Sequence, residues 1–422
     1  MFTLNKRWQP VKVGWFILSA AALIFALLFL GFSLFPGAIN PAASKYFPLA
    51  LAEKARIYNF PPRILYIISF SLQAALLFWL LFSSKGKSLY KGIQKLGQKY
   101  WFITALSVVC VWLLERLVSL PFSYYLGFYW QKAWGFSTQS QASWWIEYLK
   151  SAGIDFILTL IGGLIFFWLV NRLSRYWWVV GAVLFSIWLL VDYLLWPIVI
   201  SPLFNKFTPI SDPHILNMIN SLARQAGMHL SGIFVMDASK QTTLANAYFT
   251  GIGSSKRIVI YDTLLRNYSL SEIKAVIAHE MGHWRHNDVI HGLLYGMLGG
   301  VAAFGLLAFL LKPWLTKITK KPPELWAALQ LALLLLLFVS NPVQNAVSRG
   351  MELRADAFSL KLTRNLPAEI KLQKDLARTS LADVSPPSFI VWFSYDHPSP
   401  VARIQALKRE YSQDFPDAAG NH

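Results

Sequence analysis

The chain has 422 residues, of which 55% are hydrophobic and only 14% are charged. Soluble domains carry about 25% charged residues, so the composition excludes an ordinary soluble protein and indicates an integral membrane protein. The 39 Lys and Arg residues outnumber the 21 Asp and Glu residues, but they gather in short segments between apolar runs, which is typical of loops at a membrane surface. We therefore expect contact with membrane lipid and no nucleic-acid partner.

Seven apolar segments are candidates for membrane-spanning helices, because a hydrocarbon core of roughly 30 Å needs about 20 apolar residues in a helix. Five of them precede a polar insert and two follow it. They cover residues 13–44, 64–84, 101–130, 156–171, 176–200, 289–311 and 325–348. Glu115, Arg116 and Asp192 lie inside these segments, where charged residues usually pair with one another or face a water-filled interior.

The polar insert that follows the fifth segment has the pattern of a small α/β unit. Apolar residues recur at helical spacing within residues 213–226, which predicts an amphipathic helix. β-branched and aromatic residues predict strands or strand edges at residues 232–237, 246–251 and 257–261.

The segment that begins with a capping box at residues 269–272 is predicted to be a helix, and it contains the sequence HEMGH at 279–283. Positions i and i+4 of a helix share one face, so His279 and His283 can reach one metal ion. Glu280 is turned away from that face and is positioned to accept a proton from the attacking water. The motif therefore predicts a hydrolytic metal site.

A catalytic zinc ion needs a third protein ligand and keeps one coordination position open. The extended motif that supplies a third histidine does not fit, because His286 and Val289 occupy its glycine and histidine positions. We expect a carboxylate from a second helix instead, with Glu352 as the candidate. Asp356, one turn further on, suits an acceptor for the spare N–H of a ligand histidine. The alternative for both acids is a solvated helix surface where they pair with neighbouring arginines.

Six segments together resemble the type I CAAX prenyl proteases, a family of integral-membrane zinc metalloproteases. They are PLFNKF at 202–207, NAYFTG at 246–251, KRIVIYDTLL at 256–265, HEMGH at 279–283, SRGMELRAD at 348–356 and DHPSPVARI at 396–404. The resemblance covers nearly the whole chain. It implies a multi-pass α-helical membrane protein with about seven transmembrane helices, which enclose a water-filled chamber, and a small α+β zincin-like catalytic domain.

The resemblance also implies a domain arrangement. Residues 1–200 would form an N-terminal membrane domain with five transmembrane helices. The catalytic domain would come in two parts, residues 201–287 with the HExxH helix and residues 349–422 with the C-terminal tail. Transmembrane helices six and seven, residues 288–348, would separate them.

Individual residues acquire roles from the same resemblance. One zinc ion per chain would be bound by His279, His283 and Glu352. Glu280 would be the general base, Asp356 would support a ligand histidine, and His397 and Arg403 would face the substrate and the developing oxyanion. An extended substrate would pair with an edge strand that contains Asn246, Ala247 and Tyr248.

The sequence thus predicts a zinc metalloendopeptidase that cleaves peptide or protein substrates near their C-terminus, with isoprenylated substrates as the family implies. One alternative is a bacterial quality-control zinc protease without prenyl specificity. The sequence ends in DAAGNH, without the retrieval signals of eukaryotic relatives, which favours a bacterial inner membrane over an ER membrane. A metal-binding polytopic transporter is the second alternative, and it would have no need of Glu280 as a base.

Overall fold

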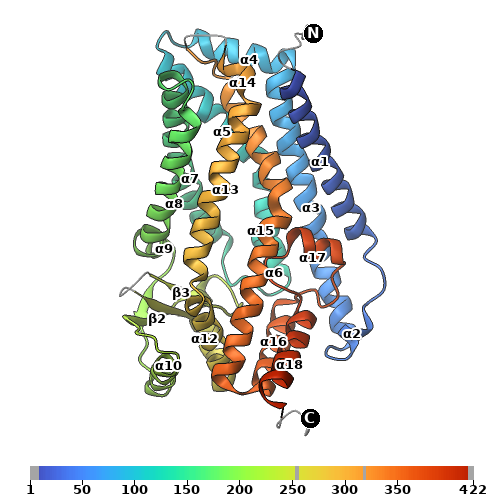
Figure 1. Cartoon of the computed structure of the whole chain (residues 1–422). Helices are drawn as coiled ribbons and strands as arrows, with labels where there is room; N and C mark the ends of the chain where they lie inside the picture. Colours follow the sequence, from blue (N-terminus) through green and yellow to red (C-terminus); the bar gives the residue numbers. More distant parts are fainter. Residues whose placement is uncertain (1–8, 252–255, 317–319, 417–422) are drawn as a thin grey trace.

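The computed structural model describes residues 9–251, 256–316 and 320–416. Long helices form an upright bundle, and a four-stranded sheet with shorter helices lies at one end of it (Figure 1). The bundle consists of α1 (Gln9–Leu34), α3 (Leu49–Phe82), α5 (Tyr100–Tyr124), α7 (Gln141–Arg172), α8 (Trp177–Leu195), α13 (Asp288–Leu310) and α15 (Leu325–Thr363). Short helices at its ends are α2 (Pro41–Ser44), α4 (Ser84–Lys95), α6 (Gln131–Ala133), α9 (Ser201–Phe204) and α14 (Lys312–Leu315), with π-helical turns η2 (Tyr125–Trp130) and η3 (Trp196–Ile200).

Seven helices of the described chain are long and apolar enough to cross a membrane, which confirms the seven predicted spans. Three of them extend well beyond the predicted segments, and of these α7 begins at Gln141, well before the predicted start at residue 156. Helix α3 begins at Leu49 and contains Pro61 and Pro62, which membrane helices tolerate when neighbouring groups satisfy the freed carbonyls. Helix α15 has 39 residues and is therefore about 58 Å long at 1.5 Å per residue, about twice the thickness of a hydrocarbon core. Its C-terminal half emerges from the bundle and carries Glu352 to the end where the sheet lies.

A polar pair joins two helices inside the bundle. Arg116 on α5 forms an ion pair with Asp155 on α7, and the indole of Trp112 donates a hydrogen bond of 2.7 Å to the same carboxylate. The side chains of Arg116 and Asp155 remain 34% and 40% exposed. Glu115 forms a hydrogen bond with Gln330. The predicted pairing of intramembrane charge therefore holds for Arg116, whereas Asp192 has no ion pair with any residue that the structure describes.

The sheet contains β1 (Phe207–Pro209), β2 (Gly232–Met236), β3 (Ala247–Thr250) and β4 (Arg257–Tyr261) in the order β1-β2-β4-β3. Strands β2 and β4 are parallel, while β1 and β3 run antiparallel to their neighbours. The three predicted strands are confirmed, and β3 lies at an edge of the sheet. Strand β1, with only three residues, was not predicted because no periodic pattern can be recognised in so short a segment.

The remaining helices are α10 (Pro213–Gln225), the 3₁₀ turn η4 (Ala238–Lys240), α11 (Asp262–Asn267), α12 (Leu270–Arg285), α16 (Leu366–Ser380), α17 (Ser388–Ser394) and α18 (Pro400–Asp414). Of these helices, α10 lies beside the sheet and α16 and α18 lie beside the emerging half of α15 (Figure 1), while α17 packs against α1 and α15 in the bundle core. The core between sheet and helices contains Ile258 and Ile260 from β4 and Ile277 and Met281 from α12, all fully buried. These contacts fix α12 against the sheet.

Helices α12 and α15 approach each other closely at one glycine. A Cβ atom at Gly282 would lie 2.8 Å from the Cα of Ala355, so only glycine fits between the two backbones. The hydroxyl of Ser359 donates to the carbonyl oxygen of Ala275 at 2.9 Å and ties the same two helices together. This close packing brings the HEMGH segment next to Glu352.

Candidate metal centre

Helix α12 begins where the capping box predicts. Ser269 is its N-cap, and the backbone N–H of Ser269 donates to Glu272 Oε2 at 3.0 Å. The helix ends at Arg285, so the HEMGH segment occupies its last turns. His279 and His283 lie on one face, with their ring centroids 4.8 Å apart.

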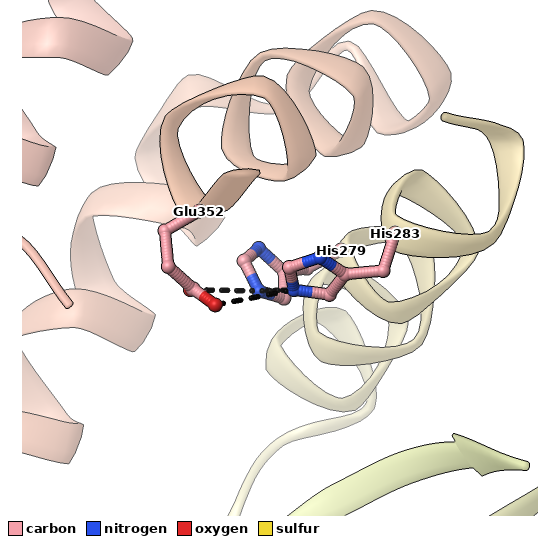
Figure 2. A group of neighbouring side chains, drawn as sticks. All are labelled: His279, His283 and Glu352. Carbon is pink, nitrogen blue, oxygen red and sulfur yellow. Dashed lines mark hydrogen bonds and ion pairs between the residues drawn. The ribbon is translucent and has the colours of Figure 1, made fainter. Parts of the chain in front are cut away.

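Glu352 reaches from α15 towards these two imidazoles (Figure 2). Its carboxylate oxygens lie 3.3 Å from His279 Nε2 and 3.3 Å from His283 Nε2, and the two Nε2 atoms lie 3.1 Å apart. One potential ligand atom from each of the three residues lies within 4.8 Å of the others. The predicted ligand set is therefore assembled in space, and the solvated alternative for Glu352 is wrong because the residue is 6% exposed.

The protonation of these groups fits a cation. His279 Nδ1 lies 2.9 Å from Asp356 Oδ1, and His283 Nδ1 lies 3.0 Å from Asp288 Oδ2. In the neutral form, an imidazole that donates from Nδ1 has a lone pair on Nε2, so the two rings can direct lone pairs at one point once a metal ion displaces their additional protons. Glu352 Oε2 is a buried oxygen that accepts no hydrogen bond from any described residue. Two imidazole nitrogens and a carboxylate are one of the donor sets found in catalytic zinc sites.

Asp288 is a further residue of this centre that the sequence analysis missed. The turn between α12 and α13 contains Asn287 in the left-handed conformation, with φ of 53°, which asparagine tolerates better than most residues. This turn directs Asp288 back towards His283, five positions earlier. Arg354 on α15 donates to the other oxygen of Asp288 at 2.9 Å. The unassigned Nδ1 atom of His283 was the one signal that could have prompted a search for this acid.

Asp356 takes the position predicted for it, next to His279, and it is 3% exposed. Arg403 on α18 donates from Nε to Asp356 Oδ2 at 2.7 Å and from a terminal nitrogen to Oδ1 at 2.5 Å. The same guanidinium lies 3.8 Å from Glu352 Oε2. Arg403 thus lies behind the ligand residues, paired with an acid, whereas the sequence analysis expected it to face a substrate.

The buried acids give this centre a strong preference for positive charge. Burial alone would lower the pKa of His279, but its contacts with Asp356 and Glu352 outweigh burial and raise the pKa to about 10. The pKa of His283 is raised as well, because the contact with Glu352 outweighs burial. The negative charges of Glu352 and Asp356, which stabilise a protonated imidazole, also favour a metal cation in the same place.

Glu280 lies beside the two histidines and next to the edge strand. Burial raises the pKa of Glu280, although His279 and His283 act in the opposite direction. The carboxylate also accepts a hydrogen bond from the backbone N–H of Phe249 in β3. The ring of Phe249 stacks on Trp284, with centroids 5.7 Å apart. These contacts hold the predicted base at the free edge of the sheet.

His397 approaches the same centre from the segment between α17 and α18. Its Nε2 atom lies 3.3 Å from Glu352 Oε1, and its side chain is 53% exposed. Arg349 on α15 donates to the carbonyl oxygens of Val391 and Tyr395, at 2.9 and 2.6 Å, and so fixes the segment that carries His397. His397 is the most exposed of the groups around Glu352, which places it on the open side of the centre.

The three residues expected to meet a substrate lie at or beside the edge strand. Asn246 immediately precedes β3, and its carbonyl oxygen accepts a hydrogen bond of 2.9 Å from the N–H of Tyr261. Ala247 is 3% exposed and packs in the core beneath α12. The side chain of Tyr248 packs with Met236 and Val259 in a separate cluster. The side chain of Asn246 is exposed, and its Oδ1 atom accepts a hydrogen bond of 2.8 Å from the N–H of Ala247.

Two family profiles match this chain. The profile described as CAAX prenyl protease N-terminal, five membrane helices, matches residues 36–206, and that of peptidase family M48 matches residues 209–411. The metalloprotease YhfN of Bacillus subtilis is 34% identical over 379 residues, which is 88% of each chain. The CAAX prenyl protease 1 of Saccharomyces cerevisiae is 31% identical over 70% of this chain and 69% of its own.

A solved structure agrees with these matches. The crystal structure of S. mikatae Ste24p superposes with a TM-score of 0.79 at 25% identity and covers 96% of this chain and 99% of that one. The predicted fold class is confirmed, and the transporter alternative finds no support. The chain belongs to peptidase family M48, carries the five-helix N-terminal region of the CAAX prenyl proteases, and is a multi-pass membrane metalloprotease that acts on peptide or protein substrates.

Proposed function

We propose that this metalloprotease is a zinc endopeptidase with one zinc ion per chain. The observation that carries the proposal is the convergence of two Nε2 lone pairs and an unsatisfied carboxylate oxygen, from His279, His283 and Glu352, beside the buried base Glu280. A zinc ion bound there supplies a Lewis acid for the scissile carbonyl and lowers the pKa of a water molecule to about 7.

The proposal assigns the proton transfers to Glu280. A carboxylate with a raised pKa takes a proton from the attacking water more readily than an ordinary one, and it can then give that proton to the departing amine. His397 is the group on the open side that can donate a hydrogen bond to the oxyanion as it forms. Its Nδ1 atom contacts Asp396 at 2.9 Å, so donation from Nε2 requires the imidazolium form, with a hydrogen on each ring nitrogen.

The remaining assigned residues would position these groups. We propose that Asp356 and Arg403 hold the ring of His279, and that Asp288 holds the ring of His283. An extended substrate would add to the edge of β3 through the backbone of Asn246, Ala247 and Tyr248. The hydrogen bond from the backbone N–H of Phe249 to Glu280 supports this arrangement, because it places the proposed base directly beside the edge of β3.

The proposed cleavage site lies near the C-terminus of prenylated substrates. One relative that matches 70% of this chain is named CAAX prenyl protease 1, and another that matches 73% is named a homolog of it. The five-helix profile matches residues 36–206, which contain α3, α5, α7 and α8. The match to a Bacillus metalloprotease over 88% of the chain favours a second candidate, a bacterial inner-membrane protease that cleaves polypeptides without a prenyl group.

The proposed domain limits are residues 1–200, 201–287, 288–348 and 349–422, although α15 runs unbroken across the last boundary.

The test is the cleavage of a farnesylated peptide with a C-terminal CAAX sequence and of its unprenylated twin, followed by mass spectrometry in detergent. Release of the last three residues only from the farnesylated peptide, abolished in Glu280→Gln, would establish prenyl-dependent cleavage. Equal cleavage of both peptides would keep the zinc protease and favour the second candidate. Full activity of Glu280→Gln would refute the assignment of the base.

A further inference from the structure

A second polar site lies where the bundle meets the sheet, away from the metal centre. A cavity of about 520 Å³ is open to the surface there. Its lining comes from α7, α9, β1 and η4, with Glu147, Lys150, Asn205, Lys206 and Lys240 as the polar residues. Cavities of roughly 300–1,000 Å³ are typical of small-molecule sites, so this one can accept a ligand the size of a lipid headgroup.

The charges in this cavity are of both signs. Three ammonium groups line it, and Lys150 Nζ donates to Glu147 Oε1 at 3.2 Å and to the carbonyl oxygen of Leu203 at 3.1 Å. Glu147 Oε2 and Asn205 Oδ1 are buried oxygens that accept no hydrogen bond from the described residues. Buried acceptors are almost always paired, so the cavity favours a ligand with both an anionic group for the lysines and N–H donors for these oxygens.

The cavity also lies at the level of a membrane surface. It adjoins the ends of two candidate spans, Gln141–Arg172 and Trp177–Phe204, that face the sheet. Trp145 and Tyr148 on α7 are aromatic residues of the kind that gather at membrane interfaces. Next to the cavity, Leu149 and Leu203 are 63% and 52% exposed, which offers an apolar surface for acyl chains.

We propose that this cavity binds the headgroup of a zwitterionic phospholipid with a primary amine, of the phosphatidylethanolamine type. The phosphate accepts hydrogen bonds from Lys150 and Lys206, and the ammonium donates to Glu147 Oε2 and Asn205 Oδ1. A choline headgroup cannot make the second set of contacts, because its nitrogen has no hydrogen. The bound lipid would link α7 and α9 of the bundle to β1 and η4 of the sheet region. This proposal does not depend on the substrate or the metal.

The test uses the full chain, delipidated in detergent, with dioleoyl phosphatidylethanolamine, phosphatidylcholine or phosphatidylglycerol at equal mole fraction, and native mass spectrometry to count bound lipid. We expect phosphatidylethanolamine to bind about tenfold more tightly than phosphatidylcholine, because hydrogen bonds to charged groups are strong. Glu147→Gln should reduce this preference to less than about twofold. The double variant Lys150→Gln and Lys206→Gln should weaken all three lipids about tenfold.

Matched controls lie at the same end of the bundle. Glu53→Gln and the double variant Lys45→Gln and Lys54→Gln change exposed residues outside the cavity and should leave lipid binding unchanged. Equal binding of phosphatidylethanolamine and phosphatidylcholine, or a preference that survives Glu147→Gln in a variant with a native melting temperature, would overturn the proposal. Water-soluble glycerophosphoethanolamine distinguishes the source: if it displaces the lipid at equal concentration, the site takes a soluble ligand and the lipid proposal is wrong.

Discussion

The metal centre and the polar pair inside the bundle both join charged side chains from two helices, but their surroundings differ. At the metal centre, the side chains of Glu352 and Asp356 are 8% and 4% exposed, and histidine or arginine contacts surround each carboxylate. Inside the bundle, the side chains of Arg116 and Asp155 are 34% and 40% exposed. The first group of charges is closed off by protein, whereas the second remains accessible within a membrane-spanning segment.

At the metal centre, protein groups satisfy the charged side chains, whereas water can satisfy part of the charge of the Arg116–Asp155 pair. A buried charge without a partner is costly, so each acid of the metal centre needs several fixed donors, and the loss of one disturbs the others. A half-exposed pair can replace a lost partner with water, and polar residues in membrane helices usually face such a hydrated interior. The two regions should therefore respond very differently to the removal of one charge.

Removal of the proposed carboxylate ligand should have the largest effect. Glu352→Gln keeps the shape of the side chain but removes the negative charge, so we expect loss of bound zinc and a fall in kcat/KM of about a thousandfold or more. Zinc content by elemental mass spectrometry and peptide cleavage check this. Treatment of the unchanged protein with a chelator should reproduce the loss, and added zinc should restore it. A variant that keeps stoichiometric zinc would show that Glu352 is not a ligand.

Glu369 tests how strongly the buried surroundings of the metal centre disfavour an ionised carboxylate. This residue on α16 is 2% exposed, and its Oε1 atom lies 2.6 and 2.9 Å from the hydroxyl oxygens of Ser359 and Thr363. Burial outweighs both contacts and raises the pKa of Glu369 to about 7. Between the unfolded pKa of about 4.3 and pH 7, the folded state keeps a proton that the unfolded state has lost. Stability should therefore fall as pH rises through this window, by about 4 kcal/mol, and then level off.

Glu369→Gln removes this ionisation and keeps an oxygen acceptor. We expect the variant to melt at a higher temperature than the unchanged protein at pH 8, and the difference to shrink towards pH 5. Thermal melting in detergent, monitored by tryptophan fluorescence over this pH range with zinc present, measures the difference in melting temperature at pH 8 and its decrease towards pH 5. Glu53→Gln, on an exposed face of α3, is the matched control and should shift nothing. A difference that is the same at every pH would contradict the assignment to Glu369.

Asp288→Asn should have a smaller effect, confined to the metal. Asparagine can still accept a hydrogen bond from His283 Nδ1, but it loses the charge that also pairs with Arg354. We expect zinc affinity to fall by about 10–100-fold, as for other residues that hold a metal-binding histidine, with little change in melting temperature of the metal-free protein. Competition with a zinc chelator measures the affinity. An unchanged affinity would mean that the contact with Asp288 does not support the ligand.

Around the metal centre, local sequence patterns predicted those features that depend on a single helix or strand. The capping box and the HEMGH spacing located α12, and β-branched residues located β2 and β4, because each signal depends on neighbours in sequence. Asp288 was missed because its position depends on a left-handed Asn287, which no periodicity reveals. The segment around Glu352 was expected to be helical, but its continuity with the preceding span was missed, because the change from apolar to charged residues after residue 348 resembles the end of a membrane-spanning helix. Tertiary contacts with α12, not composition, keep that segment helical.

The polar pair in the bundle should show the smallest effect. Asp155→Asn removes the charge opposite Arg116, and a pair with side chains this exposed should contribute less than about 1 kcal/mol, because water can solvate the arginine. The matched comparison is Asp383→Asn, which breaks an ion pair with Arg63 whose side chains are 1% and 9% exposed. Breaking that closed pair should cost about 3–5 kcal/mol. Melting temperatures of the two variants in the same detergent test the contrast directly. Equal decreases in melting temperature would mean that the interior of the bundle excludes water around Asp155. Breaking an ion pair would then cost as much there as in the buried Arg63–Asp383 pair.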